Sequence, residues 1–106
     1  MPQFMVKFTV RQPDTVSNKD LFEIWKREAT AAMGAVEAGA VTGLWKVAGQ
    51  RVVLAIIELP SAEDLDRALA GLPIIREMGG GVRTEALPIY DYRTFADDLN
   101  QGVHGP

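Results

Sequence analysis

The sequence of 106 residues has no cysteine and only one histidine, His104. Without cysteine, the chain can form neither a disulfide framework nor a thiolate metal site. One histidine is too few for a transition-metal site built from histidine and cysteine ligands. Mg²⁺ and Ca²⁺ need only oxygen ligands, but the sequence contains no acidic cluster that indicates such a site. We therefore expect no metal ligands and no metal cofactor.

The sequence also lacks a strong charge of either sign and a long apolar run. The formal net charge is −3, and Lys and Arg are scattered, so nucleic acid is not an expected partner. The longest uncharged apolar run, residues 52–57, is far too short to span a bilayer. The opening MPQFMVKF has neither the basic start nor the apolar stretch of a signal peptide. These features predict a cytoplasmic protein.

The composition is that of one ordinary globular domain, with 47% hydrophobic and 24% charged residues. Strict alternation in residues 4–11 predicts a half-buried strand. Similar patterns predict three further strands and two helices. The predicted strands are residues 4–11, 41–48, 51–59 and 82–89, and the predicted helices are residues 18–37 and 62–70.

This order, β-α-β-β-α-β, predicts an α+β, ferredoxin-like fold with a four-stranded antiparallel sheet and both helices on one face. Residues 52–57 are apolar on both strand faces, so we expect that strand to be central. The uncovered face carries apolar residues, which indicates a homodimer or larger homo-oligomer formed by sheet-to-sheet packing, a dimeric α+β barrel. We expect this domain to cover residues 1–92, followed by a C-terminal tail, residues 93–106.

The segments between these elements contain local signals. Gly49 and Gln50 are interpreted as a two-residue turn between two strands, with the glycine first as in a type II′ hairpin. Residues 72–75 are read as an apolar linker, and residues 79–81, all glycine, as a flexible break. Residues 94–97 predict one last turn of helix in the tail.

The predicted helix over residues 18–37 separates polar from apolar residues, with one exception. Its polar side carries Glu23, Lys26, Arg27 and Thr30. Glu28 lies instead on the apolar side, between Trp25 and Ala32. Burial there would raise its pKa and make it a better base at neutral pH. The alternatives are that Glu28 lies at the edge of the apolar stripe and extends its carboxylate to solvent, or that it pairs with Lys7 or Arg11.

Several segments together resemble the muconolactone delta-isomerase family. They are FMVKFTV at residue 4, Glu28, Gly39, GLWKVAG at residue 43, IIELPSAEDLDRAL at residue 56 and GLPII at residue 71. The resemblance covers about residues 4–76. Where the family has a histidine near the end of its last strand, this chain reads ALPIYDY.

The resemblance implies a cofactor-independent enzyme that moves a double bond within a small unsaturated lactone acid in aromatic catabolism. It implies Glu28 as the proton-transferring base and subunits that assemble further. Two alternatives stay open. One is a cofactor-free cyclase or monooxygenase that tailors a polyketide, which needs a broader, aromatic-lined pocket. The other is a non-catalytic binding protein of the same fold.

The strands and helices supply three further candidate site residues. Trp25 and Trp45 are candidate walls of a substrate pocket for a flat organic ligand, although a plain core role is the alternative. Lys7 lies on the strand face opposite Val6 and Phe8. It is a candidate catalytic cation that holds a substrate carboxylate or stabilises an enolate, and the alternative is a solvated strand charge.

The last candidates come from the second half of the chain. Arg76 follows the apolar linker and is a candidate for closing over a bound ligand. Tyr90 and Tyr92 lie on either side of Asp91, just after the last strand. A phenol there, first of all that of Tyr90, could donate a hydrogen bond to a developing oxyanion. The alternative is that both tyrosines anchor the tail on a neighbouring subunit.

Overall fold

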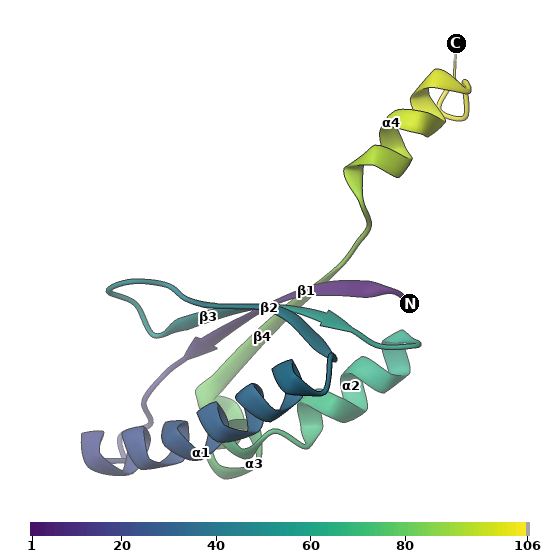
Figure 1. The fold of residues 1–106 in the computed structure, drawn as a ribbon. Helices are drawn as coiled ribbons and strands as arrows, with labels where there is room; N and C mark the ends of the chain where they lie inside the picture. The colour runs from purple at the N-terminus through teal and green to yellow at the C-terminus, as the bar shows by residue number, and fades with distance from the viewer. Residues whose placement is uncertain (106) are drawn as a thin grey trace.

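Four antiparallel strands form one sheet in the computed structural model, which describes residues 1–105 (Figure 1). Along the chain they are β1 (Gln3–Val10), β2 (Val41–Lys46), β3 (Val52–Glu58) and β4 (Val82–Ile89). Their order across the sheet is β2-β3-β1-β4, so β3 is an interior strand, as predicted. The ferredoxin-like prediction is confirmed.

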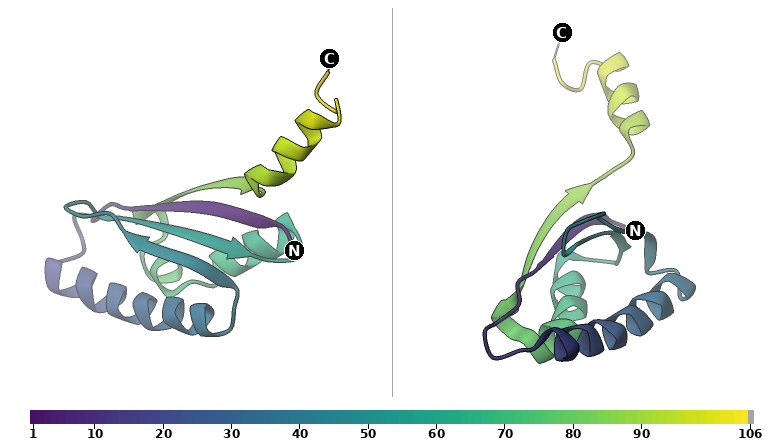
Figure 2. Two further views of the ribbon diagram at one scale, coloured as in Figure 1. Left: turned by 45° about the horizontal axis from the view of Figure 1, so that its top comes forward. Right: turned by 90° about the vertical axis from the view of Figure 1, so that its left-hand side faces the viewer.

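Three helices cover one face of this sheet and leave the other face uncovered (Figures 1 and 2). They are α1 (Asn18–Glu37), α2 (Ala62–Ala70) and α3 (Pro73–Met78). The hydroxyl of Ser17 caps α1 by accepting from the Asp20 N–H at 3.1 Å, and Ser61 caps α2 in the same way. Both helices have the predicted bounds. Within residues 1–105, no helix is long and apolar enough to cross a membrane.

The prediction of an apolar linker at residues 72–75 is wrong, because α3 begins at Pro73. The next residues, Gly79–Gly81, form a short 3₁₀ turn and not a flexible break. Proline at the first helical position and glycine after the last one are typical helix ends. The six-residue helix is too short to be stable alone. Its buried residues, Ile74 and Met78, pack against Leu21 and Ile24 of α1.

The turn between β2 and β3 also differs from the prediction. The Val47 N–H donates to the Val52 carbonyl at 2.9 Å, so four residues form the loop and not two. Gly49 has a φ of +76° and is the third residue of a turn closed by the Gln50 N–H on the Val47 oxygen. A type II′ turn needs its positive φ at the second position, which is Ala48.

The tail forms a longer helix than the single turn predicted. Helix α4 (Tyr92–Asn100) begins two residues before Thr94, because the Asp91 side chain caps it by accepting from the Arg93 N–H at 2.8 Å. Figure 1 shows α4 projecting from the end of β4, away from α1 to α3. The molecule is correspondingly elongated, with extents of 57 × 26 × 23 Å.

The core between helices and sheet consists of two clusters. The first lies under α2 and contains Phe4, Val6, Val41, Ala55, Ile57 and Leu65. The second joins α1, α3 and the end of β1, and contains Val10, Leu21, Ile24, Ile74 and Met78. Residues of both clusters border a cavity under α1. The fold therefore leaves a space in the layer where a core would normally be continuous.

Candidate functional site

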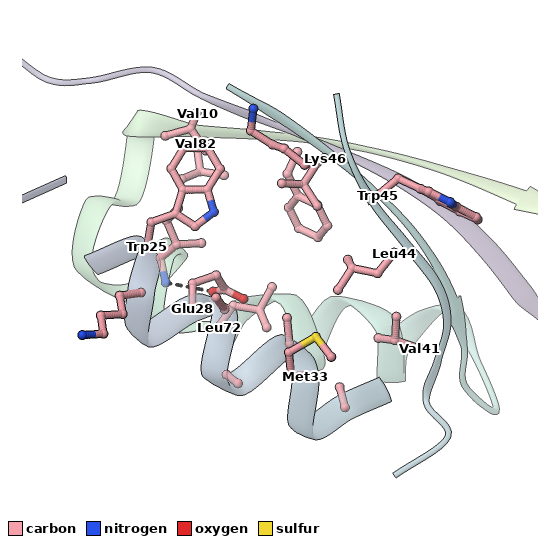
Figure 3. Close-up of a pocket in the computed structure, with 18 of the residues that line it drawn as sticks. Val10, Trp25, Glu28, Met33, Val41, Leu44, Trp45, Lys46, Leu72 and Val82 are labelled. Carbon is pink, nitrogen blue, oxygen red and sulfur yellow. Dashed lines mark hydrogen bonds between the residues drawn. The ribbon is translucent and has the colours of Figure 1, made fainter. Parts of the chain in front are cut away.

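A cavity of about 630 Å³ lies between α1, α3 and the helix-facing side of the sheet (Figure 3). Its lining residues are Phe8, Val10, Phe22, Trp25, Lys26, Glu28, Ala29, Ala31, Ala32, Met33, Ala35, Val41, Leu44, Trp45, Lys46, Val53, Ile57, Leu72, Ile74 and Val82. Three of these residues carry a charge: Lys26, Glu28 and Lys46. The cavity is therefore mainly apolar, with Glu28 as the one carboxylate among these lining residues.

Short side chains on α1 explain why this space is not filled. Ala29, Ala32 and Ala35 all line the cavity. Alanine strongly favours a helix, but its methyl group does not extend far from the helix surface. Two larger residues of α1, Phe22 and Met33, are 54% exposed, so they border an opening to solvent and do not pack in the interior. Part of the apolar stripe of α1 therefore forms a wall of the cavity.

Glu28 points into this cavity (Figure 3). Its Oε1 accepts a hydrogen bond from the backbone N–H of Ile74 at 3.0 Å, and within residues 1–105 no side chain donates to either oxygen. Burial raises the pKa of the carboxyl group, and the Ile74 N–H opposes this with a smaller lowering effect. The predicted pairing with Lys7 or Arg11 is absent from the described residues. A half-buried carboxylate with a raised pKa suits proton transfer.

The two tryptophans differ in their relation to the cavity. Trp25 is half-buried, and Figure 3 shows its ring beside the cavity, one helical turn before Glu28. It stacks on Phe22 at 6.2 Å between ring centroids. Trp45 borders the cavity but is 55% exposed, and its ring points away from the space. The ring lies over Gly43 on the uncovered face of the sheet, where a Cβ on residue 43 would be 2.5 Å from it.

The other four predicted site residues do not line the cavity of a single chain. Lys7 is exposed on the uncovered face, because it alternates with the inward-facing Val6. Arg76 is exposed in α3, and Tyr90 and Tyr92 are 63% and 74% exposed beyond the end of β4. The structure therefore brings Glu28 and Trp25 together, leaves Trp45 at the border of the cavity, and places the other four candidates elsewhere.

Three cavity residues were not predicted from the sequence: Phe8, Leu44 and Lys46. Strand pairing places them on the helix-facing side, since Lys46 is paired with Val53 and Val53 with Phe8. Alternation along a strand shows which residues share a face of that strand. It does not show which residues of other strands lie beside them, because that depends on the register between strands distant in the sequence. The sequence did contain one signal for the cavity, the row of alanines in α1. A helix face of such short side chains leaves space beside it.

The described residues offer no evident site for a metal. Among residues 1–105, no group of three or more His, Asp or Glu side chains is placed to hold an ion. The chemistry available from the cavity residues is that of one carboxylate, two lysines at the edge and one indole N–H.

Comparisons with known proteins agree with this architecture. A family model described as muconolactone delta-isomerase matches residues 3–88, from β1 to the end of β4. Among solved structures, a crystal structure of muconolactone isomerase at 3.3 Å resolution has a TM-score of 0.70 and 24% identity, and the match covers 84% of this chain and 88% of that chain. A comparison with curated proteins gives no match. At this identity the structural match shows a common fold, and the family model extends over most of the chain.

Proposed function

The chain belongs to the muconolactone delta-isomerase family, as the sequence resemblance predicted, and we propose that it is an isomerase with Glu28 as its base. It moves a carbon–carbon double bond within an unsaturated, enolisable carbonyl compound, without a cofactor. The observation that carries this proposal is a single half-buried carboxylate that faces an otherwise apolar cavity. Trp25 is the wall beside it.

Each step of this reaction needs only one carboxylate. Glu28 takes a proton from one end of the allylic system, which is the carbon next to the carbonyl or the γ carbon beyond a conjugated double bond, and the electron pair of the broken C–H bond delocalises onto the carbonyl oxygen as a dienolate. The carboxylic acid of Glu28 then returns the proton two carbons farther along, and the double bond shifts. No electrons are gained or lost overall. Burial moves the pKa of Glu28 toward neutral pH, where the same group can act both as general base and as general acid.

The surroundings of Glu28 support this role. The Ile74 N–H holds one oxygen in place at 3.0 Å, which leaves the other oxygen to face a ligand. The cavity opens to solvent beside Phe22 and Met33, so the proton on Glu28 exchanges with water. One carboxylate can then remove a proton from the substrate and return one to it.

A non-catalytic binding protein is the competing function, and the Ile74 hydrogen bond is the observation that favours it. In that case Glu28 is only an acceptor for the first turn of α3. Glutamine keeps the shape and an acceptor oxygen but has no basicity. Glu28→Gln therefore separates the two functions, because a purely structural role survives this change.

The test is the rate of deuterium uptake from D₂O into muconolactone or another unsaturated ketone or lactone, followed by NMR. Glu28→Gln should lower the enzymatic rate by roughly 10²- to 10⁴-fold, the usual contribution of a general base. Glu23→Gln is the matched control, since Glu23 is an exposed carboxylate of the same helix, and it should keep the wild-type rate. A Glu28→Gln variant with a rate near that of the wild type would overturn the proposal.

A further inference from the structure

We infer that the Glu28 cavity binds a flat, largely apolar, enolisable ketone of about three fused rings, and not a small lactone acid. This inference rests on the proposed function, because it names the substrate class for the same site. Three observations carry it: the volume of the cavity, the nature of its walls, and the position of its two lysines at the cavity edge.

The volume is too large for a small lactone acid. Such a molecule has about ten non-hydrogen atoms. Even at the roughly 30 Å³ that one water molecule occupies in the liquid, ten atoms fill only about 300 Å³. The cavity measures about 630 Å³. A small acid would therefore occupy under half of this half-open cavity, whereas a ligand of about three rings would cover most of its apolar lining.

The walls favour a flat and apolar ligand. One wall is the surface of α1, where Ala29 and Ala32 present only methyl groups. The opposite wall comes from the sheet and includes Phe8 and Leu44. Burying aromatic rings between such walls is favourable by about 25 cal/mol for each Å² removed from water. A small polar acid would gain little from this surface.

The charges of the site do not suit a carboxylate. The Lys46 ammonium donates to the backbone oxygens of Val47, at 3.0 Å, and Gln50, so it is held at the hairpin turn. Lys26 is exposed and lines the edge of the cavity. Glu28 is itself an anion and would repel a second one. A carboxylate brought beside Glu28 would lose part of its water there, while the two lysines lie at the edge of the cavity, so its burial is costly.

A ketone oxygen needs only one hydrogen-bond donor, and Trp25 offers one. Figure 3 shows the indole nitrogen of Trp25 turned toward the cavity. Its ring is on the same helix as Glu28, three residues earlier, so both side chains lie on one face. An enolisable ketone could place its carbonyl at the indole N–H and its acidic carbon at Glu28.

The experiment compares anthrone, a three-ring enolisable ketone, with muconolactone, using the fluorescence of Trp25. A Trp45→Phe background leaves Trp25 as the sole tryptophan. Anthrone should quench the signal saturably, with a Kd at least tenfold below that of muconolactone. Ala32→Leu fills the cavity and should weaken anthrone binding by about tenfold or more. The control is Ala68→Leu on an exposed position of α2, which should leave binding unchanged. Tighter binding of muconolactone, or an unchanged Kd in Ala32→Leu, would overturn the inference.

A second measurement separates this inference from the proposed function. Glu28→Gln should still bind anthrone, because the walls are unchanged, but should lose deuterium uptake at the anthrone methylene. If anthrone binds and the wild type exchanges no faster than Glu28→Gln, the substrate class stands and the isomerase proposal fails. If muconolactone binds more tightly and exchanges through Glu28, the proposed function stands and the substrate class fails.

Discussion

Glu28 and Ile74 are joined by a hydrogen bond of 3.0 Å from the backbone N–H of Ile74 to the Glu28 carboxylate. The N-cap residue of α3, Leu72, has no polar side chain, and Pro73 has no N–H. A side chain from α1 therefore supplies the acceptor that the first turn of α3 lacks. The same carboxylate faces the cavity, so one residue links the position of α3 to the candidate chemistry.

Substituting Glu28 should separate these two roles in the free energy of unfolding. Glu28→Ala removes the acceptor for Ile74 and should destabilise the protein by about 1 kcal/mol, the typical value of a lost helix cap. Glu28→Gln keeps an acceptor and removes a partly buried charge, so at pH 7 it should be as stable as the wild type or more stable. Urea denaturation measures both. Equal stability of the Ala and Gln variants would show that the Ile74 contact contributes nothing.

The stability of the wild type should also depend on pH through Glu28. Burial raises the folded-state pKa of Glu28 above its ordinary value of 4.5, so the folded chain binds this proton more tightly than the unfolded chain. The resulting stabilisation is complete below about pH 4.5 and is lost as pH rises through the raised pKa. The stability of Glu28→Gln relative to the wild type should therefore increase between pH 4 and 7. A constant difference across this range would contradict the raised pKa.

The pH profile of turnover should report the same group. A base acts only when ionised, so kcat/KM should rise with pH and level off above an apparent pKa higher than 4.5. Rates measured between pH 4 and 8 on a substrate without its own ionisable group give this value directly. An inflection at or below 4.5 would mean that another group limits the rate.

Local signals in the sequence were sufficient for most of the fold. Ser17 and Gly39 mark the ends of α1, Ser61 and Gly71 mark the ends of α2, and alternation defines the strands. Helix α3 could not be predicted in the same way, because six residues carry too little periodicity. It is held by contacts with α1, including the Arg27–Glu77 ion pair at 2.5 Å. Long-range partners of this kind leave no local pattern.

The candidate site was predictable only where one helix determined it. Glu28 and Trp25 lie on one face of α1, and helical periodicity alone places them together. Lys7 and Trp45 lie on strands, where the side of the sheet that becomes the pocket depends on where the helices pack. Both were assigned to the pocket, but the Lys7 side chain lies on the uncovered face, and Trp45 only borders the cavity because its ring lies over Gly43 on that face.

The uncovered face of the sheet should be the dimer interface. Register places Ile56, Met5 and Leu87 in one row across three neighbouring strands, with Trp45 and Leu54 in the adjacent row. Leu87 is 63% exposed in the single chain, and apolar patches of this kind typically mark an interface. Ile56→Lys adds a charge at its centre and should shift the protein to monomer in sedimentation velocity at micromolar concentration.

The control for this variant is Asp66→Lys, which adds the same side chain on the exposed surface of α2. It should leave the oligomeric state unchanged. A wild-type protein that sediments as a stable monomer, or an Ile56→Lys variant that keeps the wild-type assembly, would contradict an interface on this face.

The tail should bind a second subunit through α4. This helix has an apolar stripe of Tyr92, Phe95 and Leu99, and within residues 1–105 it packs against no other element of its own chain (Figure 1). Isolated helices shorter than roughly 12–15 residues are marginal in water, so a nine-residue helix requires a contact elsewhere. Deleting residues 93–106 should therefore reduce the size of the assembly in light scattering and lower the Tm.

A point variant tests the same contact without shortening the chain. Leu99 is 49% exposed, and Leu99→Asp places a charge on the apolar stripe of α4, where burial against a neighbouring subunit would be costly. It should weaken assembly as the deletion does, whereas Asp97→Asn, on an exposed position of the same helix, should not. If the truncated chain and Leu99→Asp both keep the wild-type oligomeric state and Tm, α4 does not join subunits. If only the deletion weakens assembly, the contact is made by another part of the tail, and the stripe of α4 is not the contact surface.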